Sequence, residues 1–303
     1  MLYLLLASLI WAFSFGIIKT SLAALDPGFV GWARLLLSVA LFAPFVGGPA
    51  LTERRLGGQL LAIGAIQYGL MYCLYLAAYA HLDAHQIALF TVFTPIYVVL
   101  WSDLRARRLR PLGLLCAALA VLGAALLSER DLGSGDLLVG FALVQAANLC
   151  FAVGQIEYRR LRIHRPELRD RQVHVLLLLG GLAVTGIATS LRGGWPGLAE
   201  LDAPALAALA YLGLIASGVG FFAWNAGAVR TAPATLAVLN NLKIPLGIAA
   251  ALLLFGEEAD LPRLFLGGSI MLGAAWLSQR TARSSPRSAN HDTRASATDT
   301  PPR

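Results

Sequence analysis

Apolar stretches of similar length follow one another along almost the whole chain, with short polar or basic segments between them. A helix needs about 20 apolar residues to cross the roughly 30 Å of hydrocarbon in a bilayer. Ten stretches come near that length: 2–20, 28–47, 59–79, 86–102, 111–128, 137–157, 173–191, 204–229, 234–255 and 263–279. The pattern predicts an all-α integral membrane protein with ten transmembrane helices.

The two ends of the chain differ in character. The first apolar stretch runs on to Ile18 with no basic start and no small-x-small cleavage site, so we expect a membrane span there and not a signal peptide. Residues 281–303 have almost no apolar content. Such a segment cannot offset the entropy cost of its own ordering, which predicts a disordered tail.

The composition agrees with a membrane as the solvent. Hydrophobic residues make up 57% of the 303 positions and charged residues 14%, which is too apolar for a water-soluble domain of this size. Cys73, Cys116 and Cys150 lie inside predicted spans and have no metal-ligand spacing. We therefore expect no metal, no cofactor, and the lipid bilayer as a partner.

Basic residues alternate between successive connections. The even-numbered connections and the tail together carry 18 arginines, whereas the odd-numbered connections carry three. Because basic residues of membrane proteins collect in cytoplasmic loops, we predict a multi-pass protein of a bacterial-type inner (plasma) membrane with both termini cytoplasmic. The net charge of +7 comes with no nucleic-acid motif, so no nucleic-acid partner is expected.

The chain resembles itself at an offset of 150 residues. This shift pairs Pro95 with Pro245 and the segment 123–128 with 273–278, and a weaker match at an offset of 138 links the first and sixth spans. Five spans per half is an odd number, so the halves would enter the membrane from opposite sides. The expected organisation is two inverted five-helix repeats, 1–128 and 129–280, followed by the tail. Inverted repeats are typical of secondary transporters, and a duplication kept only for packing is the alternative.

Several short motifs resemble the EamA family of the drug/metabolite transporter superfamily. They are WAFSFGIIK at 11–19, Asp26 and Pro27, Arg34 early in the second span, and Gly256 with Glu257 after the ninth. The resemblance covers about residues 2–280 and implies a central pathway for amino acids, carboxylates or related metabolites, with export as the expected direction. Arg107 stands where the second repeat has Glu257, so Glu257 is expected to be a helix-end or loop residue.

Lys243 is the clearest candidate for a substrate-binding charge. An ionisable side chain at the bilayer centre costs roughly 2.5 to 3.5 kcal/mol, so its presence needs a reason. Lys243 lies near the middle of the ninth span, on one face with Asn240 and just before Pro245, whose ring frees the backbone carbonyl of Asn241. These groups could bind a substrate carboxylate. A purely structural pairing of Lys243 is the alternative.

Four tyrosines in the third span, Tyr68, Tyr72, Tyr75 and Tyr79, share one narrow helical stripe. The stripe is about 16 Å long, more than one interface belt can hold, so at least two hydroxyls must lie at depth. We expect them to line a pathway, with helix packing as the alternative. The other candidate residues for binding a small-molecule substrate are Trp11, Ser14, Asn148, Asn225, Lys19 and Arg34, of which the last two lie nearer outer ends, where long side chains can reach head groups.

The main prediction is a transmembrane secondary transporter of a small polar metabolite, with no catalytic residues. A passive channel is one alternative. A polytopic membrane enzyme is another, since His81, Asp83 and His85 could bind a metal or supply an acid and a base. Small residues in the fifth and tenth spans, such as Gly123, Gly268 and Gly273, are compatible with a homodimer.

Overall fold

The computed structural model describes residues 1–105, 107, 135–196, 201–231 and 233–262, together with 264–266, 268–270 and 272–273, apart from the side chains of residues 135 and 233–238. In this part of the chain all regular structure is helical. The first half contains α1 (Leu2–Ser21), α2 (Pro27–Phe42), η1 (Ala43–Phe45), α3 (Pro49–Thr52), α4 (Arg54–Gly64), η2 (Ala65–Leu70), α5 (Met71–Ala77), η3 (Ala78–Ala80), α6 (Ala84–Phe90), η4 (Thr91–Phe93) and α7 (Thr94–Arg105). The second half contains α9 (Gly135–His164), α10 (Asp170–Arg192), α11 (Ala203–Ala210), η6 (Tyr211–Val219), α12 (Gly220–Arg230) and α13 (Pro233–Leu254).

Seven helical runs are long and apolar enough to cross a membrane. They are Leu2–Ser21, Pro27–Phe45, Arg54–Ala80, Ala84–Arg105, Asp136–His164, Asp170–Arg192 and Ala203–Arg230, and a shorter apolar helix, Leu239–Leu254, follows them. These overlap predicted spans one to four and six to nine, with the largest differences at the start of the third and the end of the sixth. The all-α membrane fold is confirmed. The fifth span, most of the tenth and the tail lie outside the described residues, so the count of ten stays a prediction.

Acidic side chains fix the starts of several spans. Asp26 precedes Pro27 at the first position of α2, and its carboxylate accepts a hydrogen bond from the Phe29 N–H at 3.0 Å. Asp202 does the same for α11 through the Ala205 N–H at 2.8 Å. An acidic cap followed by proline satisfies a free N–H and presets the helical φ angle. The Asp-Pro motif is therefore the signal that starts the second span.

Glycines let α4 and α10 pack backbone against backbone. A Cβ atom added at Gly64 would lie 1.8 Å from the Leu177 carbonyl oxygen, and one added at Gly180 would lie 2.0 Å from the Leu61 carbonyl oxygen. No real side chain fits at such distances, so small residues are required on both helices. We call this contact the glycine seam. Close approach through small residues is how helices associate within a bilayer, where no hydrophobic force pulls them together.

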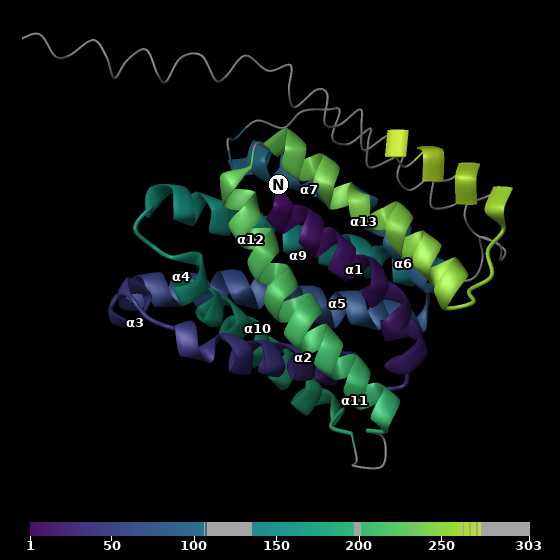
Figure 1. Ribbon diagram of the computed structural model, residues 1–303, viewed down its shortest axis with the longest axis horizontal. Coiled ribbons are helices and arrows are strands. Elements are labelled where there is room, and N and C mark those ends of the chain that lie inside the picture. The colour runs from purple at the N-terminus through teal and green to yellow at the C-terminus, as the bar shows by residue number, and fades with distance from the viewer. Residues whose placement is uncertain are drawn as a thin grey trace, which may run out of the picture.

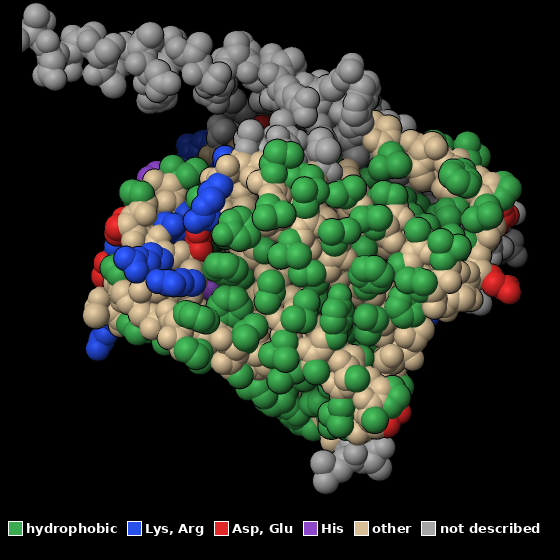
Figure 2. Space-filling view, in the orientation of Figure 1, with side chains coloured by type: hydrophobic (Ala, Val, Ile, Leu, Met, Phe, Trp, Pro, Cys, Tyr) green, Lys and Arg blue, Asp and Glu red, His purple; other side chains and the backbone are tan. Residues whose placement is uncertain are grey.

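The helices form two groups that each combine both halves of the sequence (Figure 1). In one group α10 packs on α2, α4 and η2, and in the other α1 packs on α13, α12 and α6. Figure 2 shows a broad face over α1, α11, α12 and α13 on which hydrophobic side chains are spread throughout and charged side chains are almost absent, with Lys and Arg gathered at one end. Leu191 and Leu253 are both 82% exposed, which suits a surface in contact with lipid.

Candidate functional site

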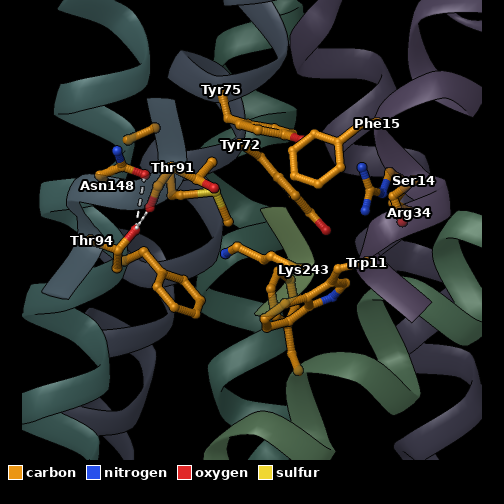
Figure 3. A pocket seen from close by; sticks show the side chains of 14 residues that line it. Trp11, Ser14, Phe15, Arg34, Tyr72, Tyr75, Thr91, Thr94, Asn148 and Lys243 are labelled. Atoms are coloured by element: carbon orange, nitrogen blue, oxygen red, sulfur yellow. Dashed lines mark hydrogen bonds between the residues drawn. The ribbon is translucent and has the colours of Figure 1, made fainter. Parts of the chain in front are cut away.

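A cavity lies between the two helix groups near the middle of the spans. Its atom-free space, counted out to its opening, is about 580 Å³. Its lining comes from both halves of the sequence and is shown in Figure 3: Trp11, Ser14, Phe15, Arg34, Met71, Tyr72, Tyr75, Thr91, Thr94, Ala147, Asn148, Phe151, Phe221 and Lys243. We call it the central cavity. None of these lining residues is acidic.

Lys243 brings an ammonium group into the central cavity from α13 (Figure 3). The residue is 7% exposed, and its Nζ lies 5.3 Å from the Trp11 ring centroid and 5.9 Å from that of Phe151. No carboxylate pairs with it among the described residues. Aromatic faces attract a cation, but they compensate only part of its lost hydration. A bound anion would supply the missing partner.

Arg34 forms a second cationic group at the cavity wall. Its side chain is buried, its Nε donates to the Ser217 hydroxyl at 3.1 Å, and its guanidinium lies 4.4 Å from the Tyr72 ring centroid. The Tyr72 and Ser217 hydroxyls are 2.7 Å apart, so the three groups form one network. One terminal nitrogen, Nη1, is buried without a partner. Arg34 therefore points into the bundle, and the option that it reaches the head groups is wrong.

The tyrosine stripe divides between the central cavity and the packing around it. Tyr72 and Tyr75 line the cavity. The Tyr79 hydroxyl is 2.8 Å from that of Tyr75 and lies behind it, and the Tyr68 hydroxyl accepts a hydrogen bond from Asn225 at 2.8 Å. Asn225 in turn accepts from Gln67 at 3.0 Å. Tyr68, Tyr79 and Asn225 thus support the wall and do not line it.

The third and eighth spans each contain a π-helical segment, η2 and η6. In both spans, cavity-lining residues follow the segment within the next few positions: Met71 after η2 and Phe221 after η6. A π turn shifts the backbone hydrogen bonds by one residue and leaves carbonyl groups available to side chains. The Ala216 carbonyl in η6 accepts from the Trp11 indole at 2.9 Å, and the Leu212 carbonyl accepts from the Ser217 hydroxyl at 2.7 Å. These bonds fix the Trp11 ring and the Arg34 network in place.

Thr91 and Thr94, which the sequence analysis missed, form a polar corner with Asn148. The Thr94 hydroxyl lies 2.9 Å from the Thr91 carbonyl and 3.1 Å from the Asn148 side-chain oxygen, so its one hydrogen is shared between two acceptors (Figure 3). The Asn148 amide nitrogen donates to the Phe90 carbonyl at 2.9 Å. The available signal was Pro95, since it matches Pro245 beside Lys243. Phe15 lies on the same mixed helical face as Trp11 and Ser14. The other two aromatic walls, Phe151 and Phe221, had no signal, because they look like any core phenylalanine.

Three other predicted site residues lie away from the central cavity. Asn240 is buried beside a second cavity, and its amide nitrogen is 3.4 Å from the side-chain oxygen of Asn241. Lys19 donates to the Tyr79 and Leu82 carbonyls at 3.2 and 2.9 Å, and its Nζ is 3.3 Å from Asp83. Seven of the thirteen predicted residues therefore line the cavity: Trp11, Ser14, Arg34, Tyr72, Tyr75, Asn148 and Lys243.

Glu257 closes the end of the bundle near Lys19. Gly256 ends α13 with a φ of 66°, a left-handed conformation that favours glycine. The chain then turns so that the Glu257 carboxylate accepts from the N–H groups of Ala84 and His85 at 2.8 and 3.0 Å, at the start of α6. It also lies 2.8 Å from the His85 ring nitrogen. Burial raises the pKa of Glu257, but these hydrogen bonds outweigh it and bring the pKa below its ordinary value of 4.5.

The histidine cluster considered for an enzyme does not form one site. His81 is 3.0 Å from Asp136, Asp83 pairs with Lys19, and His85 pairs with Glu257. No group of three or more His, Cys, Asp or Glu side chains that could hold a metal occurs among the described residues. The three residues therefore do not form the shared metal site considered from the sequence.

Comparison with known proteins identifies the same family twice along the chain. The model of the EamA-like transporter family matches residues 1–129 and again residues 140–279. A protein of Pseudomonas aeruginosa named probable biotin transporter is 39% identical over 282 residues, 92% of this chain and 97% of that one. The biotin transporter of Escherichia coli is 32% identical over 282 residues, covering 92% and 93%.

More distant relatives share the length but carry another name. A probable amino-acid metabolite efflux pump of Escherichia coli is 26% identical over 286 residues, covering 90% of this chain and 92% of that one. One solved crystal structure superposes with a TM-score of 0.61 at 19% sequence identity and covers 92% of this chain and 96% of that chain. At that identity the likeness supports the fold alone.

Proposed function

Because the chain belongs to the EamA-like transporter family, we propose that it is a secondary transporter that carries biotin or a closely similar small carboxylate across the membrane. It is a multi-pass membrane transporter of a small molecule and not an enzyme. The carboxylate would bind in the central cavity, to which access alternates between the two sides of the membrane.

The observation that carries the proposal is the Lys243 ammonium, which has no carboxylate partner in the part of the chain that the structure describes. A buried cation without a carboxylate is costly unless a ligand completes it. Arg34, with its unpartnered Nη1, adds a second donor across the cavity. With no acidic side chain in the described lining, the cavity favours anions over amines.

The remaining lining suits the rest of a biotin-like molecule. Such a ligand joins its carboxylate to an aliphatic chain and a cyclic urea, and therefore needs apolar walls and hydrogen-bonding groups at one end. Trp11, Phe15 and Phe151 provide walls, and the corner of Thr91, Thr94 and Asn148 provides donors and acceptors. An amino acid would bring its own ammonium group, for which the described lining has no carboxylate partner. The biotin class is therefore preferred over the amino-acid class of the more distant relative.

We also retain the architecture predicted from the sequence as part of the proposal. It has ten transmembrane helices in two inverted repeats, 1–128 and 129–280, both termini on the cytoplasmic side of a bacterial inner membrane, and a tail over 281–303. The two family matches over residues 1–129 and 140–279 support this arrangement. The direction of net transport, predicted to be export, depends on the solute gradients and can be measured by transport in proteoliposomes. A homodimer through spans five and ten stays a prediction.

The test is biotin binding and transport by the purified protein. Biotin should raise the melting temperature of wild type, because a ligand that binds only the folded state stabilises it. Loss of a charged hydrogen bond costs about 1.5 to 3 kcal/mol, so Lys243→Ala and the volume-matched Lys243→Met should weaken binding about 10- to 150-fold. Binding of the neutral amide of biotin should change little and serves as the control.

Transport is measured in proteoliposomes loaded with or without unlabelled biotin. Saturable uptake that accelerates when biotin is present on the far side identifies a carrier, whereas a passive channel shows neither property. Equal biotin affinity in wild type and both Lys243 variants would refute the assignment of Lys243. Absence of any biotin binding in wild type would refute the substrate class.

A further inference from the structure

A second cavity lies beside the central one, toward the end of the bundle where arginines gather. It holds about 880 Å³ of atom-free space, counted out to its opening. The described residues that line it are Thr94, Pro95, Val98, Ser102, Arg105, Gln155, Ile156, Arg159, Arg160, Ile163 and Asn240. Thr94 lines both cavities, so a solute in the second cavity is next to the polar corner of the central one.

The charge lining this second cavity is positive. Arg105, Arg159 and Arg160 contribute guanidinium groups, and the described lining contains no acidic residue. Arg105 is partly compensated, since its Nε is 3.3 Å from Glu157. Arg159 has no such partner: its Nε is buried and makes no hydrogen bond. Among the three arginines that line this cavity, Arg159 is therefore the one with a buried guanidinium nitrogen that has no partner.

We propose that the second cavity is an anion vestibule in which Arg159 draws carboxylates toward Thr94 and on to Lys243. The inference rests on the proposed function, because it takes the substrate to be a carboxylate. The vestibule adds a weaker binding step that precedes binding in the central cavity and is not part of the proposed function itself. Arg159 is a residue that determines affinity for the anion on entry, and Lys243 holds the anion afterwards.

The position of Arg159 separates this role from that of a topology signal. An arginine that only marks the cytoplasmic side extends to lipid head groups, as the exposed Arg171 can do. Arg159 is instead half-buried in the wall of the cavity, and its Nε is shielded from solvent. A cleft of one charge sign focuses the field and raises the association rate of an opposite charge by about 10- to 1,000-fold, an effect that salt screens. The vestibule should therefore act on the association rate more than on the dissociation rate.

The experiment is stopped-flow binding of biotin to detergent-purified protein, where both ends of the bundle are open to solution. Trp11 lines the central cavity and provides the fluorescence signal. At low salt, Arg159→Gln should lower the biotin association rate about tenfold, with little change in dissociation, and Arg159→Lys should restore most of it. Arg171→Gln removes the same charge at the same end of the bundle and should leave the rate unchanged.

Two further measurements keep the inference testable. The neutral amide of biotin should associate equally fast with wild type and Arg159→Gln, and the biotin rate of wild type should fall with ionic strength more steeply than that of Arg159→Gln. If Arg159→Gln does not fold, Ser102→Asp places a negative charge in the same cavity and should slow biotin, while Ser102→Asn should not.

The outcomes distinguish the vestibule from the proposed function. If wild type binds biotin and the biotin association rate of Arg159→Gln is as fast as that of Arg171→Gln, the vestibule is refuted and the carrier proposal stands. If Arg159→Gln lowers the association rates of biotin and of its neutral amide equally, the vestibule is also refuted, because the loss then does not depend on the charge of the ligand. If wild type does not bind biotin at all, the substrate class has failed before the vestibule is tested.

Discussion

Removing the Glu257 carboxylate should loosen the end of the bundle that it closes. Glu257 joins the segment after α13 to the start of α6 through three hydrogen bonds of 2.8, 3.0 and 2.8 Å. The Glu257 and His85 side chains are only 12% and 8% exposed, so water does not readily replace the lost acceptor. Hydrogen bonds to a charged group contribute about 1.5 to 3 kcal/mol each but are not additive.

From this geometry we expect Glu257→Ala to lower the free energy of unfolding by about 3 to 5 kcal/mol, the usual cost of removing one partner of a buried pair. Glu257→Gln keeps the size and one acceptor oxygen, and should cost about 1 to 3 kcal/mol. The assay is unfolding in mixed micelles with increasing SDS. Glu258→Gln removes the neighbouring exposed carboxylate and is the matched control.

The pH dependence gives the sign of the effect. Since the folded-state pKa of Glu257 is below its ordinary value of 4.5, the unfolded chain binds more protons at that site in acid. The stabilisation is therefore complete above 4.5 and is lost as the pH falls through the folded-state pKa. The stability gap between wild type and Glu257→Gln should narrow from about pH 6 to about pH 3. A gap that is absent at about pH 6, or that widens in acid, would contradict the reasoning.

Two packing predictions follow from the same structure. Gly64→Ala places a Cβ 1.8 Å from the Leu177 oxygen in the glycine seam and should cost about 2 kcal/mol or more in stability. Gly58→Ala, in the same helix with open space around it, should instead stabilise the protein by up to about 1 kcal/mol, because alanine favours a helix more than glycine does. SDS-unfolding curves that shift equally for the two variants would argue against the seam. Asn225→Leu leaves Gln67 and Tyr68 without their partner and should lower the free energy of unfolding by about 1 to 3 kcal/mol in the SDS assay. The affinity for biotin should change less than threefold, and a tenfold loss of affinity would place Asn225 in the site.

The sequence predicted most of the fold because membrane spans depend on one strong physical signal. A run of apolar residues of the right length must become a helix in lipid, since the backbone has no other partner there. The ends of the third and sixth spans were less accurate, because both helices continue past the apolar run into basic segments. The π-helical segments η2 and η6 had no recognisable pattern in the sequence. The carbonyl groups of η6 accept hydrogen bonds from Trp11 and Ser38, which lie far away in the sequence.

Site residues could be predicted where the side chain is costly to bury in lipid. They could not be predicted where the side chain is of an apolar type common in every membrane helix. Lys243, Arg34 and Tyr72 stood out because charges and phenols at depth require partners. The direction in which Arg34 points depends on Ser217, which is 183 positions away in the sequence and could not be inferred. Phe151 and Phe221 are as apolar as any membrane residue. Their role as cavity walls follows only from the arrangement of the helices.

The glycine seam has a consequence for how access could alternate. It joins α4 of the first half of the sequence to α10 of the second with backbone in contact with backbone, so there is no layer of flexible side chains along which the two could slide. Two helices joined in this way move as one rigid body. The bodies that could move are then the two helix groups and not the two sequence repeats, and connections such as 22–26 and 81–83 join one group to the other.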